Sequence, residues 1–415
     1  MEHKELVIIS TAGSVDDGKS TLIGRLLYDC DSIYQDVLKD LKKYKNKDSA
    51  IDNLAYLTDG LEAEREQGIT IDVAYRHFTH ADRKFLLVDV PGHEQYTRNM
   101  ITGVSRADAV IIIVDVTLGI SIQSKRHFFI ASMMGVKNII FTINKMDLVG
   151  YKKEVFERVK DDLERYSKRL KIFNCIYIPI SAKYGDMVVN RGNNLKWYKG
   201  KTLINYLDTF TLDSEIRPKD FRMPVQYVLN ESGFRGYAGK VEGGELGSGD
   251  EIVIVPSMKR TRIKNIYVGF DKVKRCFKRQ SVLISVADKI DISRGDMFIG
   301  TKDSIKQASI LDVILFWFDE KDIKKGNGFI LKNNTKEVRG MIKKIDYIVD
   351  IKNNSHIKTV KFIRQNDIAR VTLELNSDVF FDSYEKNKNT GSCIIIDDIT
   401  HNTIGACIIL DKKEK

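Results

Sequence analysis

The sequence has little of what marks a secreted, membrane-spanning or zinc-binding protein. Its 415 residues include five cysteines, five prolines and two tryptophans. The cysteines are scattered, without a CxxC pair or a neighbouring cluster of histidines, which argues against a disulfide framework and against a zinc site. We expect reduced, mostly buried thiols at Cys30, Cys175, Cys276, Cys393 and Cys407.

Long apolar runs are also missing. The longest one near the front of the chain, residues 109–114, is far shorter than the roughly 20 residues that a membrane helix needs. The opening stretch MEHKELVIIS has four consecutive apolar residues, too few for a signal peptide. We therefore predict a cytoplasmic protein with no membrane partner.

Positive charge is in excess, with a net charge of +10 and a pI near 9.1. The clearest basic segment is KRTRIKNIYVGFDKVKRCFKR, residues 259–279. Its bases are spread over an alternating, strand-like pattern, and no aromatic stacking pattern accompanies them. A solvated basic face is therefore the favoured interpretation, a polyanion-binding surface is the alternative, and we do not expect a nucleic-acid partner.

The first half of the chain alternates short apolar runs with longer amphipathic stretches. Buried strands are predicted at ELVIIS, KFLLVDV, DAVIIIVDV, NIIFTINK and CIYIPIS, and helices at residues 17–29, 121–135 and 152–170. Such alternation is typical of a doubly wound, mainly parallel α/β sheet.

Beyond SEIRPKDFRMPV the long helical periodicity stops, and short strands broken by glycine follow. This spacing of turn signals predicts small antiparallel β-barrels. At 415 residues the chain is also too long for one compact core. We predict an α/β domain at residues 1–215, a barrel at 220–304 and a second barrel at 305–415.

A phosphate-binding loop lies between the first predicted strand and the first helix. Gly13-x4-Gly18-Lys19-Ser20 matches GxxxxGK[ST] in the strand–loop–helix context that the motif requires. Backbone N–H groups of such a loop cradle phosphates, the lysine reaches the β and γ phosphates, and the serine binds Mg²⁺. The predicted phosphate-site residues are Gly13, Ser14, Val15, Asp16, Asp17, Gly18, Lys19, Ser20 and Thr21.

Two later segments fit the switches of a nucleotide hydrolase. Thr70 in EREQGIT suits a hydroxyl that closes on Mg²⁺ when a γ-phosphate is present. In DVPGHEQY, Asp89 is expected to hold the metal through water, Gly92 to contact the γ-phosphate, and His93 to orient the attacking water. Val90 and Pro91 complete the predicted contacts of this segment.

Base recognition is predicted at the ends of two further strands. In NKMD, the Asp147 carboxylate can accept both N1–H and the N2 amine of guanine, whereas adenine offers the reverse pattern. Lys145 is expected to pack along the nucleotide and Asn144 to tie the loops together. A backbone N–H of the SAK segment can meet guanine O6. The predicted base-site residues are Asn144, Lys145, Met146, Asp147, Ser181, Ala182 and Lys183.

EREQGIT and DVPGHEQY together resemble the translation-factor class of GTPases. A closer resemblance, nearly end to end, is to the large GTP-hydrolysing subunit of bacterial heterodimeric sulfate adenylyltransferase. It rests on GSVDDGKSTLIGRLLYD, DGLEAEREQGITIDVAYRHF, DVPGHEQYTRNMITG, FRGYAGKVEGGELGSGDEIVIVPS and FDSYEKNKNTGSCIIIDDITHNTIGA. Translation factors usually carry histidine where Asp17 stands, so VDDGKS favours the sulfate enzyme.

This resemblance implies a division of labour. A separate small catalytic subunit joins ATP and sulfate into adenylyl sulfate and pyrophosphate, and the present chain couples GTP hydrolysis to that reaction. GTP and Mg²⁺ are the implied cofactors, and a heterodimer is the implied assembly. Two alternatives are a translation-type factor that carries aminoacyl-tRNA and a free-standing regulatory GTPase.

The paired aspartates of the loop need their own account, because they face a polyanion. We expect Asp17 to point away from the phosphates or to accept backbone N–H groups. Asp16 lies closer to the β and γ phosphates in the expected geometry and is a candidate for recruiting a monovalent cation. The alternative, equally weighted, is that Asp16 only stabilises the loop as an acceptor.

Overall fold

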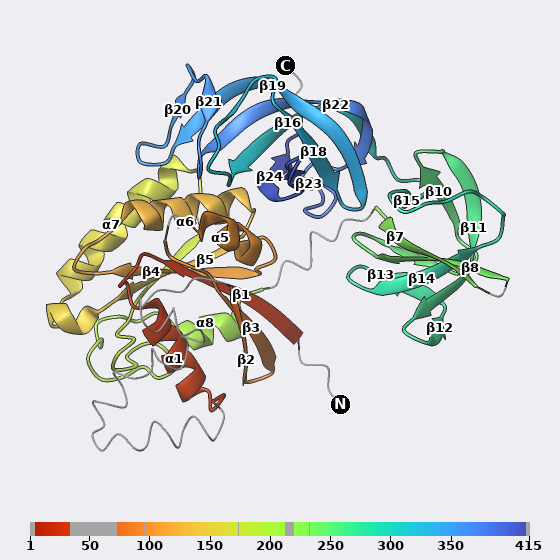
Figure 1. The fold of residues 1–415 in the computed structure, drawn as a ribbon. Helices are drawn as coiled ribbons and strands as arrows, with labels where there is room; N and C mark the ends of the chain where they lie inside the picture. The colour runs from red at the N-terminus through yellow and green to blue at the C-terminus, as the bar shows by residue number, and fades with distance from the viewer. Residues whose placement is uncertain are drawn as a thin grey trace. The chain divides into compact units, whose positions relative to one another are not determined.

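The computed structural model describes residues 5–33, 73–93, 96–172, 174–211, 220–231 and 233–411 (Figure 1). Thr70, predicted to bind Mg²⁺, lies outside these residues. The chain divides into two compact units, Met1–Leu212 with Ile351–Ser355, and Asp213–Asp350 with His356–Lys415.

The first unit contains a six-stranded sheet in the order β2-β3-β1-β4-β5-β6. β1 pairs in parallel with β3 and β4, and β5 pairs in parallel with β4 and β6. Only β2 runs antiparallel, as an edge partner of β3. The bounds are β1 Glu5–Gly13, β2 Ala74–His80, β3 Arg83–Asp89, β4 Ala109–Asp115, β5 Asn138–Asn144 and β6 Cys175–Pro179.

The central strands are apolar because helices cover both faces of the sheet. Every residue of β4, AVIIIVD, is buried. In Figure 1, α5, α6 and α7 lie on one face, and α1 and α8 lie on the other. The bounds are α1 Lys19–Asp29, α5 Thr97–Val104, α6 Ile122–Met133, α7 Lys153–Arg169 and α8 Leu203–Thr209, with a 3₁₀ turn, η3, at Met146–Val149.

Local sequence signals account for several helix starts. Ser121 accepts a 3.0 Å hydrogen bond from the Ser124 N–H at the start of α6, and Thr202 accepts from Asn205 at the start of α8. In contrast, α1 begins after Gly18 without any side-chain cap. The backbone N–H groups of its first turn can therefore donate to a ligand or to solvent, as in a helix that binds phosphate.

The second unit holds two closed antiparallel barrels. In the first, β10-β15-β7-β8-β14-β11 closes through a β10–β11 pairing. In the second, β18-β23-β24-β16-β22-β19 closes through β18–β19. Each barrel has its own core, built around residues such as Tyr237 and Phe298 in the first and Leu315 and Phe329 in the second. The α/β-plus-two-barrels fold predicted from the sequence is confirmed.

The strands of the first barrel and its appended hairpins are β7 Arg222–Glu231, β8 Phe234–Lys240, β9 Glu245–Gly247, β10 Glu251–Val255, β11 Lys259–Val268, β12 Asp271–Val273, β13 Arg275–Phe277, β14 Ser281–Val286 and β15 Met297–Gly300. Those of the second are β16 Lys306–Trp317, β17 Ile323–Lys324, β18 Gly328–Asn333, β19 Lys336–Asp350, β20 Ser355–Ile357, β21 Phe362–Ile363, β22 Ile368–Phe381, β23 Ser392–Ile396 and β24 Thr403–Ile409. The predicted limit at 304/305 falls between β15 and β16, and the exact domain limits stay a prediction.

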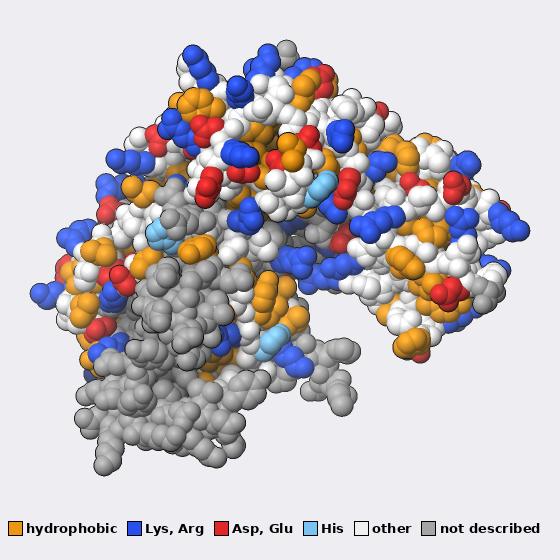
Figure 2. All heavy atoms as spheres, viewed as in Figure 1, with side chains coloured by type: hydrophobic (Ala, Val, Ile, Leu, Met, Phe, Trp, Pro, Cys, Tyr) orange, Lys and Arg blue, Asp and Glu red, His pale blue; other side chains and the backbone are white. Residues whose placement is uncertain are grey.

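The basic segment predicted at residues 259–279 covers β11 to β13, and several of its bases have acidic or carbonyl partners. Arg275 is 2.9 Å from Glu245, Arg260 is 3.9 Å from Glu251, and Arg262 donates to the Gly249 carbonyl. Figure 2 shows basic and acidic side chains interspersed over the visible face of this barrel. These pairings favour the solvated-face interpretation. Among the described residues, no helix is long and apolar enough to cross a membrane.

Candidate nucleotide site

The phosphate-binding loop connects β1 to α1 and takes a backbone path that few residues tolerate. Gly18 has φ +93° and Asp16 has φ +67°, both left-handed. A Cβ added to Gly18 would lie 2.4 Å from Nδ2 of Asn144. Glycine is therefore required at position 18 by both conformation and space.

The two loop aspartates have different surroundings. The Asp17 carboxylate is buried and accepts a 2.8 Å hydrogen bond from the Ser14 N–H. Burial raises the pKa of Asp17 to about 6, with the nearby Asp115 charge adding to the effect and the Ser14 N–H opposing it. The expectation that Asp17 bonds backbone N–H groups is confirmed.

Asp16 is exposed at the outer side of the loop. Within the described ranges, the structure gives its carboxylate no hydrogen bond or ion pair. The cation interpretation of Asp16 and the loop-stabilising alternative both stay predictions. Val15 is exposed beside it, while Ser14, Ser20 and Thr21 are half-buried.

Lys19 lies against the end of the neighbouring strand. Its ammonium group donates to the Val90 carbonyl and is 3.4 Å from Oδ1 of Asp89. The Thr11 hydroxyl donates to the same carboxylate at 3.1 Å. Asp89 is only 2% exposed, yet its charge is compensated by these two groups.

Ser20 and Asp89 are the described residues suited to hold Mg²⁺. Hydroxyl and carboxylate oxygens are the ligands that this ion prefers, and it is usually held by one or two carboxylates together with substrate phosphates. The described residues contain no group of three or more His, Cys, Asp or Glu side chains placed around a common metal position. A site completed by phosphate oxygens needs no such group, so the donor set fits magnesium.

The segment after β3 packs directly on the loop. A Cβ on Gly92 would come within 2.4 Å of the Gly13 carbonyl oxygen, so only glycine allows this approach. Pro91 is buried beside it, whereas His93 is exposed, with its ring centre 6.3 Å from that of Tyr96. The imidazole of His93 therefore stands at the surface next to the predicted γ-phosphate position.

Asn144 at the end of β5 joins three loops. Its amide nitrogen donates to the Asp17 carbonyl at 2.9 Å, and its oxygen accepts the Ala182 N–H at 2.9 Å. The predicted tying role of Asn144 is thus confirmed. Its neighbour Lys145 has φ +62° and directs its ammonium group to Oδ2 of Asp115, 2.8 Å away.

The predicted guanine reader is also held in place. Asp147 accepts a 2.6 Å hydrogen bond from the Ser181 hydroxyl through Oδ1, and within the described residues its second oxygen, Oδ2, accepts none. Met146 is buried beneath it and its N–H donates to the Ile180 carbonyl. Ala182 and Lys183 follow Ser181, and Ala182 is already engaged with Asn144.

Sequence reasoning missed several residues that support the site. Arg25 of α1 donates to the carbonyls of Ala182 and Lys183, at 3.3 and 2.6 Å, and so ties the phosphate helix to the base loop. The Tyr151 hydroxyl donates to Asp186 at 2.8 Å behind the same loop. Asp115, which pairs with Lys145, is the one supporting residue that the sequence could have indicated. It ends a buried strand, and the carboxyl ends of such strands form the ligand-binding edge of the sheet.

Comparison with known proteins supports this geometry. The model described as "Elongation factor Tu GTP binding domain" matches residues 4–218, and "GTP-eEF1A C-terminal domain-like" matches residues 311–410. A P-loop, a guanine-type base loop and two following barrels define the translation-factor class of GTPases.

Within this class the full-length relatives are more specific. The chain is 43% identical to proteins named "Sulfate adenylyltransferase subunit 1" from Cellvibrio japonicus, Saccharophagus degradans and Bacteroides fragilis. The matches cover 99 to 100% of this chain and 88% of each relative. The chain belongs to the family of sulfate adenylyltransferase subunit 1.

Proposed function

We propose that this chain hydrolyses GTP and couples that hydrolysis to the formation of adenylyl sulfate and pyrophosphate from ATP and sulfate. A separate small catalytic subunit carries out the adenylyl transfer. The observation that carries the GTP assignment is the Asp147 carboxylate, which the Ser181 hydroxyl holds in place. Asn144 joins this base loop to the phosphate-binding loop. Family membership supports the reaction, since subunit 1 implies a partner subunit.

In the proposed complex, the phosphates lie against the backbone of the loop and the start of α1. The residues proposed to bind GTP are Gly13, Ser14, Val15, Asp16, Asp17, Gly18, Lys19, Ser20, Thr21, Asp89, Val90, Pro91, Gly92, Asn144, Lys145, Met146, Asp147, Ser181, Ala182 and Lys183. To reach the β and γ phosphates, the Lys19 ammonium group must leave the Val90 carbonyl to which it donates here.

Magnesium, when bound, neutralises charge on the β and γ phosphates. Ser20 would hold it directly and Asp89 through water, with Thr70 as the further predicted ligand. His93 is the proposed positioning group for the attacking water. Its exposed place beside the buried Gly92 allows it to approach a γ-phosphate that Gly92 contacts.

A monovalent cation at Asp16 is the last element of the proposed site. It would offset the charge of an exposed carboxylate beside the phosphates. The GTPase rate should then differ between potassium and sodium salts at equal ionic strength, and Asp16→Ala should abolish the difference. Identical rates of the unaltered protein in both salts would assign Asp16 to loop structure alone.

The decisive experiment is reconstitution with the small subunit. The isolated chain should make no adenylyl sulfate from ATP and sulfate, because the proposal assigns the adenylyl transfer to the separate small subunit. With the small subunit added, GTP should raise the yield, and a non-hydrolysable analogue should not sustain it. Product formed by this chain alone would overturn the division of labour, and co-purification with tRNA instead of a small protein would favour the translation-factor alternative. The cytoplasmic location stays a prediction.

A further inference from the structure

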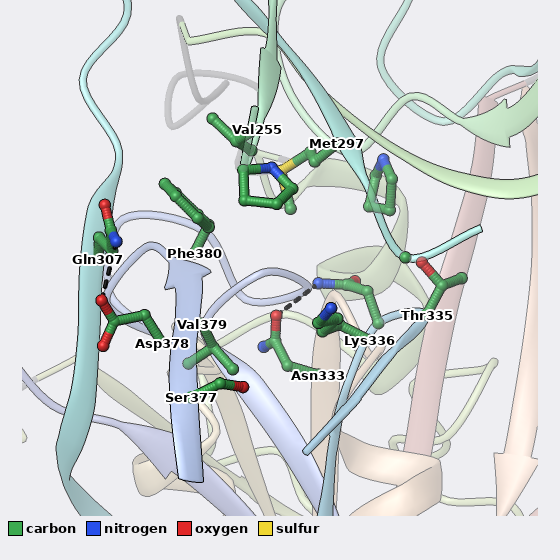
Figure 3. A pocket seen from close by; sticks show the side chains of 14 residues that line it. Val255, Met297, Gln307, Asn333, Thr335, Lys336, Ser377, Asp378, Val379 and Phe380 are labelled. Carbon is green, nitrogen blue, oxygen red and sulfur yellow. Dashed lines mark hydrogen bonds between the residues drawn. The ribbon is translucent and has the colours of Figure 1, made fainter. Parts of the chain in front are cut away.

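A cavity of about 280 Å³ in the second unit is lined by both barrels (Figure 3). Its charged lining residues, Lys336 and Asp378, are exposed at the surface. Polar groups of its wall bond one another, as the dashed lines in Figure 3 show. Gln307 donates to Asp378 at 2.8 Å, and Asn334 donates to Asn333 at 3.2 Å. These contacts hold the wall together and point to no particular ligand.

A packed, irregular segment of the first unit continues from the proposed base site. Between β6 and α8, residues 180–202 form no helix or strand apart from an isolated bridge between Ser181 and Asp186. Connections of more than about 12–15 residues without regular structure are uncommon in compact domains and are often functional. This segment is part of the core, because Met187 and Val188 are fully buried. Its path is therefore determined by packing.

Asp186 is the polar centre of this segment. It is only 5% exposed, and its Oδ2 accepts the Tyr151 hydroxyl at 2.8 Å and the Asn194 amide at 3.0 Å. A buried carboxylate needs such donors. Gly192 has φ +69°, and an added Cβ there would lie 1.9 Å from Oδ1 of Asp186, so only glycine allows this approach. The main-chain carbonyl of Asp186 accepts the Ser181 N–H at 3.2 Å, which fixes the backbone of Ser181.

Tyr151 joins Asp186 to the NKMD loop. It has φ +55°, a left-handed conformation that is rare for a bulky residue and costs free energy. Its N–H donates to the Met146 carbonyl at 2.8 Å, and its carbonyl accepts the Trp197 indole N–H at 2.8 Å. The hydroxyl bond to Asp186 is a third support. Such strain persists where the surroundings determine the conformation, and it is frequent at functional sites.

These contacts reach the proposed guanine reader. The Ser181 hydroxyl donates to Oδ1 of Asp147 at 2.6 Å, while the Ser181 main chain is bonded to Asp186. Burial and the Asp186 carboxylate raise the pKa of the Tyr151 hydroxyl. The Asp147 charge adds to this effect and the Ser181 hydroxyl opposes it. The Tyr151 hydroxyl therefore lies close to both members of the Ser181–Asp147 pair.

We propose that Tyr151 and Asp186 are positioning residues that make the base site specific for the 2-amino group of guanine. This role rests on the proposed function, in which Asp147 accepts both N1–H and the N2 amine. Two simultaneous hydrogen bonds require one orientation of the carboxylate, because a hydrogen bond weakens steeply when its groups are misaligned. A single bond to N1–H tolerates a carboxylate that turns. Loss of the support should therefore weaken guanine binding more than binding of a base without the amine.

Titration of the full-length protein with GTP and ITP tests this role, because ITP keeps N1–H and lacks the N2 amine. Displacement of a fluorescent guanine nucleotide gives both affinities. The unaltered protein should bind GTP about ten- to a hundredfold more tightly than ITP, since ITP leaves one oxygen of a charged acceptor unpaired. In Tyr151→Phe this ratio should fall about three- to tenfold, mainly through weaker GTP binding. A merely structural role would weaken both nucleotides alike and leave the ratio unchanged.

Tyr198→Phe is the matched control. It removes the same group from the same segment, but the Tyr198 hydroxyl donates to the Tyr177 carbonyl at 2.9 Å and not to Asp186. Its ratio of GTP to ITP affinity should stay within about twofold of that of the unaltered protein. Asp186→Asn keeps an oxygen that can accept from Tyr151, so it should retain more of the ratio than Asp186→Ala. Melting curves check that each variant is folded.

The possible outcomes separate this role from the proposed function. If the unaltered protein binds GTP and ITP equally, the proposed recognition of guanine fails, and the positioning role fails with it. If the unaltered protein prefers GTP and folded Tyr151→Phe keeps the same ratio, only the positioning role is overturned. An equal fall of the ratio in Tyr198→Phe would also overturn it, because any loosening of the segment would then have the same effect.

Discussion

The side-chain amide of Asn144 donates a 2.9 Å hydrogen bond to the main-chain carbonyl of Asp17. This bond joins the end of β5, where the base site is proposed, to the loop that is proposed to hold the phosphates. The same side chain accepts the Ala182 N–H, so one residue fixes the spacing of three loops. The two halves of the nucleotide site therefore depend on each other through Asn144.

Asn144→Ala should weaken GTP binding about ten- to a hundredfold, or about 1.4–2.7 kcal/mol, because the Asp17 carbonyl and the Ala182 N–H both lose the partner that fixes the spacing of the loops. Fluorescent-nucleotide titration measures this. Asn138→Ala is the matched control, since Asn138 opens the same strand and donates to the Asp108 carbonyl away from the loops. Equal losses in both variants would show that β5 as a whole, and not the loop contact, is responsible.

Asp147→Asn should exchange base preference. The new amide presents a donor to the guanine N2 amine, and a donor facing a donor costs about 1–3 kcal/mol, more where a charge is involved, as it is for this carboxylate. GTP affinity should fall roughly tenfold to several hundredfold. Asparagine still has an oxygen that can accept the Ser181 hydroxyl, so the loop should persist. XTP carries a carbonyl at position 2, so the variant should bind XTP more tightly than the unaltered protein does. If the variant binds both GTP and XTP more weakly, Asp147 does not recognise the base.

His93→Ala should separate binding from hydrolysis. The side chain is exposed and lies beside, not within, the buried loop contacts of Gly92. GTP affinity should stay within a few-fold, while the single-turnover hydrolysis rate should fall on the order of 100-fold, as for a group that acts mainly in the transition state. Comparable losses of affinity and rate would instead assign a structural role to His93.

Asp17→Asn should stabilise the nucleotide-free protein at alkaline pH. The folded-state pKa of Asp17 is about 6, above the usual 3.8, so the native state binds the proton more tightly than the unfolded chain. Stability from this group rises as pH falls from 6 towards 3.8, and the buried charge is a cost above pH 6. Asparagine removes that cost, on the order of 1–3 kcal/mol.

Melting curves at pH 8 and pH 5 measure the effect. The Tm gain of Asp17→Asn should be larger at pH 8 than at pH 5. Asp16→Asn serves as the control, because Asp16 is exposed and its substitution should change the Tm little at either pH. A gain of the same size at both pH values would show that the effect is not due to the buried charge.

Arg222→Met should destabilise the second unit. The guanidinium group is fully buried and bonds both carboxylate oxygens of Asp382, at 2.9 and 3.0 Å, 160 residues along the chain. Removing it leaves a buried carboxylate with too little compensation, at about 3–5 kcal/mol. Thermal unfolding should show the loss, and Arg222→Met with Asp382→Asn should recover part of it. Arg260→Met, which affects an exposed pair, should cost no more than about 0.5 kcal/mol.

Much of the fold was predictable because its signals are local. β4 is a continuous apolar run, and such runs alternate with amphipathic segments that become α6 and α7 within two residues of the predicted limits. β2 was not predicted. Its sequence, AYRHFTH, is largely polar, and only Phe78 is buried at this edge of the sheet, where pairing with β3 rather than burial defines the strand.

The sequence by itself determined which residues are proposed to meet a nucleotide, because each chemical task is confined to a short segment. A glycine turn with Lys19 marks a phosphate site, and Asp147 at the end of a predicted strand marks a base site. Only the tertiary structure decided which supports they have. Arg25 reaches the base loop across 157 residues, Lys145 meets Asp115, and Asp17 is buried while Asp16 is not. Burial and long-range contacts depend on how distant segments pack against each other, and local sequence does not encode that packing residue by residue.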